Sequence, residues 1–372
     1  MKITSIEVIS VRLPLKTPFI ISYHTYVDMP SIIVKVHTDT GLTGYGEGTP
    51  DEHVTGETWE GVRAVLTNTI APAVIGMSPF DMERIHDRMD KTIYGATTAK
   101  AAIDIACYDL MGKATGQPVF NLLGGRYHDT LEFPKVISIL TPEEMAAEAT
   151  AAVSEGYRIL KLKAGTDQQL DIERIRAVRH AVGDEIAIKV DANQGWETSA
   201  ASMQVLEQVK DCRIDWIEQP VIASDMHGLK EIKQKTTIPV MIDEGLHGQK
   251  EMYELTATRS ADMMNIKLMK CGGLYRAMQL VHQAELAGFT CQIGSMVESA
   301  VASAAGLHLA AAKKRIQTNE LVGPLMFSQD IAPLDIDIPF VRLSDAPGLG
   351  LEIDEAVLKE LTHAHDIMHE QL

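Results

Sequence analysis

Three acids and two lysines recur at nearly equal steps through the middle of the chain, and they constrain its fold more than any other feature. They are Lys163, Asp191, Glu218, Asp243 and Lys267, with steps of 24 to 28 residues. Each ends a short apolar run that is typical of a buried β-strand. One strand, a crossover helix and two loops take about that many residues. The spacing therefore predicts successive parallel strands whose charged ends lie on one rim.

The alternation of strand-like and helical segments extends beyond these five positions. Strand-like runs are expected near 133–140, 158–163, 186–191, 214–218, 238–243, 262–267, 289–295 and 316–321. Helical segments lie between most of them. Charged residues at the carboxyl ends of so many strands favour a closed barrel over an open doubly wound sheet. We expect a (β/α)7β TIM-like barrel.

The first third of the chain has a different organisation. Strands are expected over 2–13, 31–38 and 45–48, and helices over 58–75, 79–92 and 98–115. Strands followed by helices indicate an α+β domain. After Pro333 the chain holds Pro and Gly and then a segment expected to be helical. We predict a capping domain over 1–130, a catalytic barrel over 131–335, and a C-terminal segment over 336–372 that packs back on the cap and completes it.

Composition excludes several functions. The net charge of −17 disfavours binding to nucleic acid or to anionic membranes. No run approaches the roughly 18 apolar residues of a membrane span, and the N-terminus lacks the apolar core of a signal peptide. The four cysteines are far apart and form no CxxC motif, as expected of reduced thiols. We expect a cytoplasmic protein that acts on a small molecule.

The acids among the five residues have the chemistry of a metal site. Asp191, Glu218 and Asp243 offer three hard oxygen ligands, and no His or Cys lies near them in sequence. Such a set suits Mg²⁺, with Mn²⁺ as a possible substitute, and does not suit zinc. Carboxylates crowded on one rim are costly unless a cation lies among them. We therefore predict a divalent metal site that leaves positions for a substrate carboxylate.

The lysines have the chemistry of proton transfer. Lys163 and Lys267 lie on strands at the two sides of the acidic strands, so a closed barrel places them across the substrate from each other. An amine abstracts a weakly acidic proton when its pKa is lowered. Lys161 points to the same face of the strand as Lys163, and a like charge there favours the neutral base. These residues predict abstraction of the proton next to a carboxylate, through an enediolate.

Five short motifs carry a family resemblance. They are Lys161-Leu-Lys163, Asp191-Ala-Asn193, Glu218-Gln-Pro220, Asp243-Glu244 and Lys267-Leu-Met-Lys-Cys-Gly-Gly273. In this order and spacing the chain resembles the enolase superfamily, muconate lactonizing enzyme subgroup, over its whole length. The resemblance implies that Lys161 assists the substrate carboxylate and that Lys163 and Lys267 are the acid and base. It implies that the three acids hold Mg²⁺.

Segments of the cap and of the barrel ends narrow the expected substrate. The stretches 21–23, 28–33, 53–57, 294–299 and 320–324 resemble those of family members that racemise N-acyl amino acids. This implies an N-succinyl derivative of arginine or lysine. The residues expected to contact it are Asp51, Glu52, Tyr26, Asn193, Ser295, Met296, Glu298 and Glu320.

Some of these residues have a second interpretation. Asp51 and Glu52 are expected to meet the distal cation of the substrate, although a solvated turn would have the same residues. Glu298 either reaches the pocket or favours the N-terminus of a helix through its charge. Glu320 hydrogen-bonds Lys267 or a nearby loop, or it touches substrate. The segment 17–28 is expected to close over the site.

Other activities remain open from the sequence. A dipeptide epimerase of the Ala-Glu type typically has Asp-x-Asp after the eighth strand, where this chain has Glu320-Leu-Val. Cycloisomerisation of muconate, or an o-succinylbenzoate synthase-like elimination, would use the same metal and lysines. A non-catalytic binding protein on the same barrel is the alternative from another class. We also expect a homo-oligomer, either a dimer or an octamer.

Overall fold

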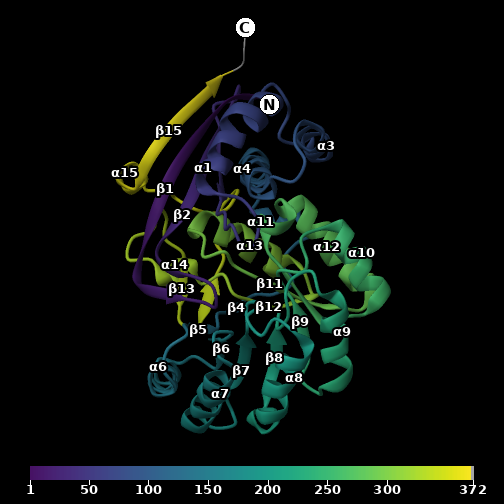
Figure 1. Cartoon of the computed structure of the whole chain (residues 1–372). Helices are drawn as coiled ribbons and strands as arrows, with labels where there is room; N and C mark the ends of the chain where they lie inside the picture. The colour runs from purple at the N-terminus through teal and green to yellow at the C-terminus, as the bar shows by residue number, and fades with distance from the viewer. Residues whose placement is uncertain (370–372) are drawn as a thin grey trace.

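The computed structural model describes residues 1–369, which form a cap stacked on a barrel (Figure 1). The cap holds an antiparallel sheet in the order β15-β1-β2-β3. Its N-terminal strands are β1 (Ile3–Ile20), β2 (Thr25–Thr38) and β3 (Thr43–Gly48). The first two are longer than the sequence predicted, because their paired ends extend as an arm beyond the sheet. The segment 17–28, expected to be a lid, is therefore the tip of a β-hairpin.

The cap helices pack on this sheet or, in the case of α3, on the other helices. They are α1 (Trp59–Val65), a π-helical stretch η1 (Leu66–Ile70), α2 (Ala71–Val74), α3 (Met82–Thr92) and α4 (Thr97–Thr115). Helix α4 is buried along most of its length and lies directly against β3. A Cβ at Gly46 would lie 1.9 Å from the carbonyl oxygen of Ala102, so only glycine permits this approach. The glycines of β3 are thus needed for close packing of α4.

The lower part is a curled sheet of parallel strands in the order β12-β11-β10-β9-β8-β7-β6-β5. These strands are β5 (Lys135–Ile137), β6 (Ile159–Lys163), β7 (Ala187–Asp191), β8 (Ile214–Glu218), β9 (Val240–Ile242), β10 (Met263–Ile266), β11 (Thr290–Ile293) and β12 (Ile316–Asn319). Each of the predicted strand-like runs contains one of them. The predicted parallel barrel fold is confirmed.

Helices lie outside the strands of the barrel (Figure 1). They are α6 (Pro142–Ser154), α7 (Gln168–Val182), α8 (Ser199–Gln208), α9 (Met226–Lys235), α10 (Gln249–Thr258), α12 (Leu274–Ala287) and α13 (Ala300–Ala312). A capping box of Thr141 and Glu144 begins α6. Helix α9 was not predicted, because its apolar stripe is narrow and Gly228 lowers its helix propensity.

Shorter elements join these parts. They are α5 (Val119–Leu122), η2 (Lys210–Cys212), α11 (Leu268–Cys271), α14 (Gly323–Met326) and β4 (Leu131–Glu132). Between the two ends of the parallel sheet, the side-chain amide of Asn319 donates to the carbonyl oxygen of Glu132 at 2.9 Å. A side-chain hydrogen bond thus links the last barrel strand to the segment that precedes the first.

The C-terminal segment returns to the cap. It contains β13 (Asp335–Asp337), β14 (Phe340–Arg342), α15 (Glu355–Glu360) and β15 (Thr362–His369). Strand β15 pairs antiparallel with β1, from Val11 opposite Thr362 to Ser5 opposite His369. The return to the cap is confirmed, but the expected terminal helix was wrong over 362–369. Alternating exposure along this segment suits the edge of a sheet. The domain boundaries at 130 and 335 stay predictions.

One buried acid holds the cap onto the barrel. Glu47 of β3 accepts hydrogen bonds from the backbone N–H of Ser299 at 2.9 Å and of Ala302 at 2.9 Å, and from the Ser299 hydroxyl at 2.6 Å. These donors lie at the N-terminus of α13, where backbone N–H groups need acceptors. Within residues 1–369, no helix is both long and apolar enough to cross a membrane.

Candidate active site

The three predicted metal ligands meet at one end of the barrel. Asp191 and Glu218 are the last residues of β7 and β8, and Asp243 follows β9 directly. All three are fully buried, and one carboxylate oxygen from each lies within 4.8 Å of the others. Parallel strands in register bring their carboxyl ends to one rim, which explains the convergence. The donor set consists of carboxylate oxygens alone and fits a hard divalent cation.

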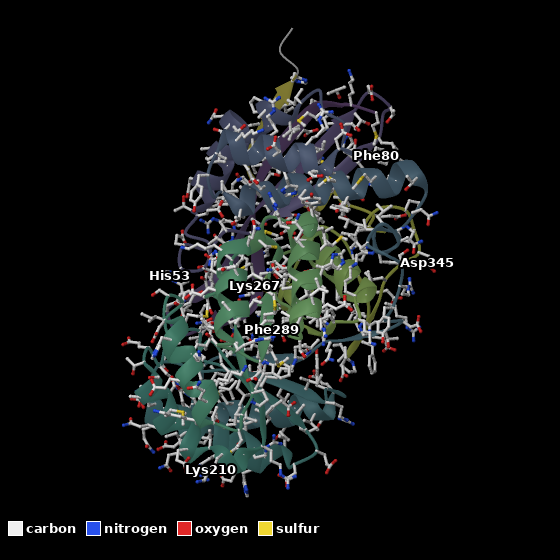
Figure 2. All side chains as sticks on the ribbon, turned by 90° about the vertical axis from the view of Figure 1, so that its right-hand side faces the viewer. His53, Phe80, Lys210, Lys267, Phe289 and Asp345 are labelled. Atoms are coloured by element: carbon white, nitrogen blue, oxygen red, sulfur yellow. The ribbon has the colours of Figure 1, made fainter. Side chains whose placement is uncertain are left out.

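The predicted lysines flank this acidic cluster. Lys163 Nζ lies 2.8 Å from Asp191 Oδ2 on one side, and Lys267 Nζ lies 2.7 Å from Asp243 Oδ2 on the other. Lys161 lies deeper, with Nζ 2.9 Å from Asp191 Oδ2 and 3.0 Å from Glu218 Oε2. Lys267 is buried, and Figure 2 labels it near the middle of the view, at about the height of His53 of the cap. The arrangement leaves one amine on each side of the carboxylates.

The charges of these groups depend strongly on one another. Burial alone would lower the pKa of Lys161, but the carboxylates around it outweigh burial and raise that pKa well above its usual value. Burial likewise opposes the charged form of Lys267, yet Asp243 and Glu244 raise its pKa above the usual value. Each of these two amines is the counter-charge of a buried acid, which stabilises its ammonium form. Burial and the Asp191 charge raise the pKa of Glu218.

Three polar residues around the cluster were absent from the predicted site. Lys270 is buried, and its Nζ donates to the backbone oxygen of Asp243 at 2.5 Å. The same Nζ also donates to Asp243 Oδ1. The amide of Asn265 donates to Glu218 Oε1 at 2.7 Å. Glu244 Oε1 accepts from the amide of Asn193 at 3.0 Å. Asn265 lies two residues before Lys267, and side chains two residues apart on a strand point to the same face. This spacing could have predicted that Asn265 points into the site.

Glu320 and Glu298 differ in what they contact. Glu320 Oε2 accepts from Lys161 Nζ at 2.6 Å, so its partner is not Lys267. Glu298 is buried, and its Oε2 accepts from the Ser295 hydroxyl at 2.5 Å and the Met296 N–H at 2.7 Å. Burial raises the pKa of Glu298 to about 7. Glu298 thus orders the loop before α13 through hydrogen bonds from Ser295 and Met296, which were also predicted to contact the substrate.

The acids of the cap loop also differ from each other. Asp51 Oδ1 accepts from the N–H groups of His53 at 2.8 Å and Val54 at 3.0 Å, and Oδ2 accepts from the Tyr26 hydroxyl. The ring of Tyr23 stacks on His53 with centroids 4.4 Å apart. Glu52 is exposed. Asp51 therefore joins the cap loop to the β1–β2 hairpin, whereas Glu52 points its charge to solvent.

Comparisons with known proteins place this fold and site in a family. Residues 3–124 match the model of the mandelate racemase / muconate lactonizing enzyme N-terminal domain, and residues 144–357 match the enolase C-terminal domain-like model. The chain belongs to the mandelate racemase and muconate lactonizing enzyme family of the enolase superfamily. The predicted superfamily is confirmed, and the chain is an isomerase of this family.

Individual relatives share nearly the whole chain. An N-succinyl-L-Arg/Lys racemase from Bacillus cereus is 55% identical, over 99% of this chain and 100% of the relative. The crystal structure of the racemase from that organism superposes with a TM-score of 0.98, covering 99% and 100%. An L-Ala-D/L-Glu epimerase from Clostridium acetobutylicum is 38% identical, over 95% and 99%. A dipeptide epimerase from Enterococcus faecalis, complexed with Mg and L-Leu-L-Tyr, is 38% identical with a TM-score of 0.91, covering 95% and 100%.

Proposed function

We propose that this chain is a Mg²⁺-dependent racemase of N-succinyl amino acids with a cationic side chain, arginine or lysine. The observation that carries the proposal is the placement of Lys163 and Lys267 on opposite sides of a buried cluster of three carboxylates. Two amines that flank one substrate carbon suit a two-base racemase, because one removes a proton and the other supplies one. The 55% identity to a racemase of this substrate class supports the choice of substrate.

Asp191, Glu218 and Asp243 would hold Mg²⁺, or Mn²⁺ as a substitute. A bound divalent cation would stabilise the negative charge that develops on the substrate carboxylate and would offset the charge of the three acids. Lys161 lies among Asp191, Glu218 and Glu320 and would assist that carboxylate from below.

The proposed reaction then uses the two outer lysines. One lysine, as the neutral amine, takes the α-proton from its side, and the electron pair of the broken C–H bond moves into the carboxylate to form an enediolate. The other lysine, as the ammonium ion, delivers a proton to the opposite face of the same carbon. The product is the mirror-image amino acid derivative, and the lysines exchange roles in the reverse direction.

The barrel end after β12 favours an N-acyl amino acid over a dipeptide. A dipeptide presents an α-ammonium group, which a relative with Asp-x-Asp at this place would bind. In this chain Glu320 is engaged by Lys161, and the next residues, Leu321 and Val322, are buried and apolar. These three residues offer one carboxylate, already paired with Lys161 through Oε2, in place of the two of Asp-x-Asp, whereas an acyl chain is compatible with apolar neighbours.

The cap loop supports a cationic side chain. Glu52 is exposed beside Asp51, whose own oxygens are engaged by the loop and by Tyr26. We infer that a distal guanidinium or ammonium group of the substrate would meet Glu52 first, with Asp51 adding longer-range attraction. Cytoplasmic location and homo-oligomeric state remain predictions.

Loss of the α-proton in deuterated water tests the function. Wild-type enzyme with Mg²⁺ should wash the α-proton out of both N-succinyl-L-arginine and N-succinyl-D-arginine and should interconvert them. L-Ala-L-Glu is the comparison substrate, because relatives with 38% identity include dipeptide epimerases. Faster turnover of the dipeptide would make epimerisation the better proposal. Loss of a leaving group would indicate elimination, and absence of exchange with every compound would indicate a binding protein.

A further inference from the structure

The tip of the β1–β2 hairpin touches the barrel at a residue that holds one of the lysines. Strands β1 and β2 run down from the cap towards the barrel (Figure 1). In the turn between them, the hydroxyl of Ser22 donates to the backbone oxygen of Asn193 at 2.8 Å. Asn193 lies two residues after Asp191, in the loop that follows β7. A residue of the cap is thereby bonded directly to the rim of the site.

Asn193 is a polar bridge between the lysine and two acids. Its Oδ1 accepts from Lys163 Nζ at 3.1 Å, and its Nδ2 donates to Glu244 Oε1 at 3.0 Å. Its backbone N–H donates to Asp191 Oδ1 at 2.9 Å. Asn193 is 5% exposed, so these bonds are shielded from water. The orientation of the Asn193 side chain therefore decides where Lys163 Nζ is held.

The backbone around Asn193 is held from both ends of one peptide unit. Asn193 has φ of +40°, in the left-handed region that asparagine tolerates better than most residues. The next N–H, of Gln194, donates to the Gln219 carbonyl oxygen at 2.8 Å. This N–H and the Asn193 carbonyl belong to the same planar unit. Ser22 at one end and Gln219 at the other thus set the rotation of that unit.

We propose that Ser22 is a positioning residue for Lys163 and acts through Asn193. The inference rests on the proposed function. Without the Ser22 hydroxyl, the Asn193 peptide loses one of its two anchors, and the bridge to Lys163 becomes less well defined. Lys267 is held directly by Asp243 on the other side of the cluster, and Asn193 acts on it only indirectly, through Glu244. Ser22 therefore matters for one of the two proton transfers.

The test measures hydrogen exchange separately for each enantiomer. Initial rates of α-proton loss from N-succinyl-L-arginine and N-succinyl-D-arginine are followed in deuterated water with saturating Mg²⁺. Lys163→Ala and Lys267→Ala first establish which enantiomer each lysine serves. Ser22→Ala should slow exchange of the enantiomer served by Lys163 by roughly 2- to 10-fold, the effect of one lost hydrogen bond. Exchange of the other enantiomer, with retention of configuration, should keep its wild-type rate.

Overall racemisation does not report this asymmetry. Its equilibrium constant is unity, so kcat/KM in the two directions must fall together, and only exchange separates the two lysines. Ser138→Ala is the matched control, because the Ser138 hydroxyl accepts from the hairpin N–H of Ile20 at 3.3 Å without contacting Asn193. It removes one hydroxyl contact of the same hairpin and should change both enantiomers equally. Thermal unfolding confirms that both variants are folded.

The outcomes separate this inference from the proposed function. If Ser22→Ala slows the exchange of both enantiomers equally, or slows neither, the positioning role is overturned. Exchange by the wild-type enzyme would still support the racemase proposal in that case. Absence of exchange in the wild-type enzyme overturns the proposed function itself. Ser22→Thr retains the hydroxyl and should restore the rate for the enantiomer served by Lys163.

Discussion

Lys161 and Glu320 form a buried ion pair across the barrel, with Nζ and Oε2 2.6 Å apart. Lys161 comes from β6, and Glu320 follows β12, so the pair joins strands near the two ends of the parallel sheet. It also gives Lys161 an acidic partner besides the two metal-ligand candidates that it contacts. The pair therefore contributes both to closure of the barrel and to the charge balance of the site.

Replacing Glu320 with Gln should reduce stability. The buried Lys161 ammonium would lose a charged acceptor, and we expect the free energy of unfolding to fall by roughly 1–3 kcal/mol. Urea unfolding of both forms in EDTA measures this difference. Glu298→Gln is the control, because Glu298 is equally buried but has hydroxyl and N–H partners and no lysine. A larger loss for Glu298→Gln would contradict the importance of the pair.

Removal of one metal ligand should reduce Mg²⁺ affinity and racemisation together. Asp243→Asn takes a negative charge from the cluster, and we expect affinity to fall roughly 100-fold or more, beyond the 10- to 100-fold typical of changes outside the ligands. Isothermal titration with Mg²⁺ measures the affinity, and polarimetry measures the activity. Wild-type enzyme in EDTA should be inactive and should recover when Mg²⁺ is added. Unchanged affinity in Asp243→Asn would place the metal elsewhere.

Loss of either outer lysine should abolish racemisation while exchange survives for one enantiomer. In Lys267→Ala, the amine of Lys163 still removes the proton that faces it, but no second amine supplies a proton to the opposite face. Proton NMR in deuterated water distinguishes exchange from inversion. Lys210→Ala, a substitution at an exposed surface lysine, serves as the control and should retain both. Full racemisation by Lys267→Ala would refute the two-base mechanism.

The two acids of the cap loop should respond differently to loss of charge. Glu52→Gln should lower kcat/KM for N-succinyl-arginine more than for N-succinyl-methionine, by about 5-fold or less, since an exposed ion pair contributes about 1 kcal/mol at most. Asp51→Asn should lower both values alike, because Asp51 holds Tyr26 and its own loop. Steady-state kinetics with both substrates test this. Equal losses in Glu52→Gln would show that Glu52 does not select the cation.

Asp330 should make stability depend on pH. It accepts from the N–H groups of Ala300 and Ile331, while burial, followed by the Glu47 charge, raises its pKa from 3.8 to about 7. Between these values the folded protein keeps a proton that the unfolded chain releases, so stability falls as pH rises. Between about pH 4 and pH 7, the free energy of unfolding of wild-type should fall by roughly 1–3 kcal/mol relative to that of Asp330→Asn.

Urea unfolding at several pH values within that window, in EDTA, measures the effect. The difference between the two proteins isolates Asp330 from other titrating groups. A difference that stays constant across the window, or grows in favour of wild-type as pH rises, would contradict the raised pKa.

The sequence by itself determined the order of strands and the rim on which the charged residues lie. A buried parallel strand is a short apolar run, so the end of the strand can be recognised from the local sequence. The nearly equal spacing of such runs predicted that Asp191, Glu218 and Lys267 lie at strand ends. These features depend on residues close together in the chain.

Only the tertiary structure decided which groups pair. Glu320 contacts Lys161 and not Lys267. Asp51 accepts hydrogen bonds from Tyr26 and from N–H groups of its own loop. The terminal segment became a strand because β1, more than 350 residues away in sequence, offers a free edge. The Ser22–Asn193 contact likewise joins two distant loops. Such pairings depend on charge, burial and geometry between segments that meet only after folding, and no local periodicity records them.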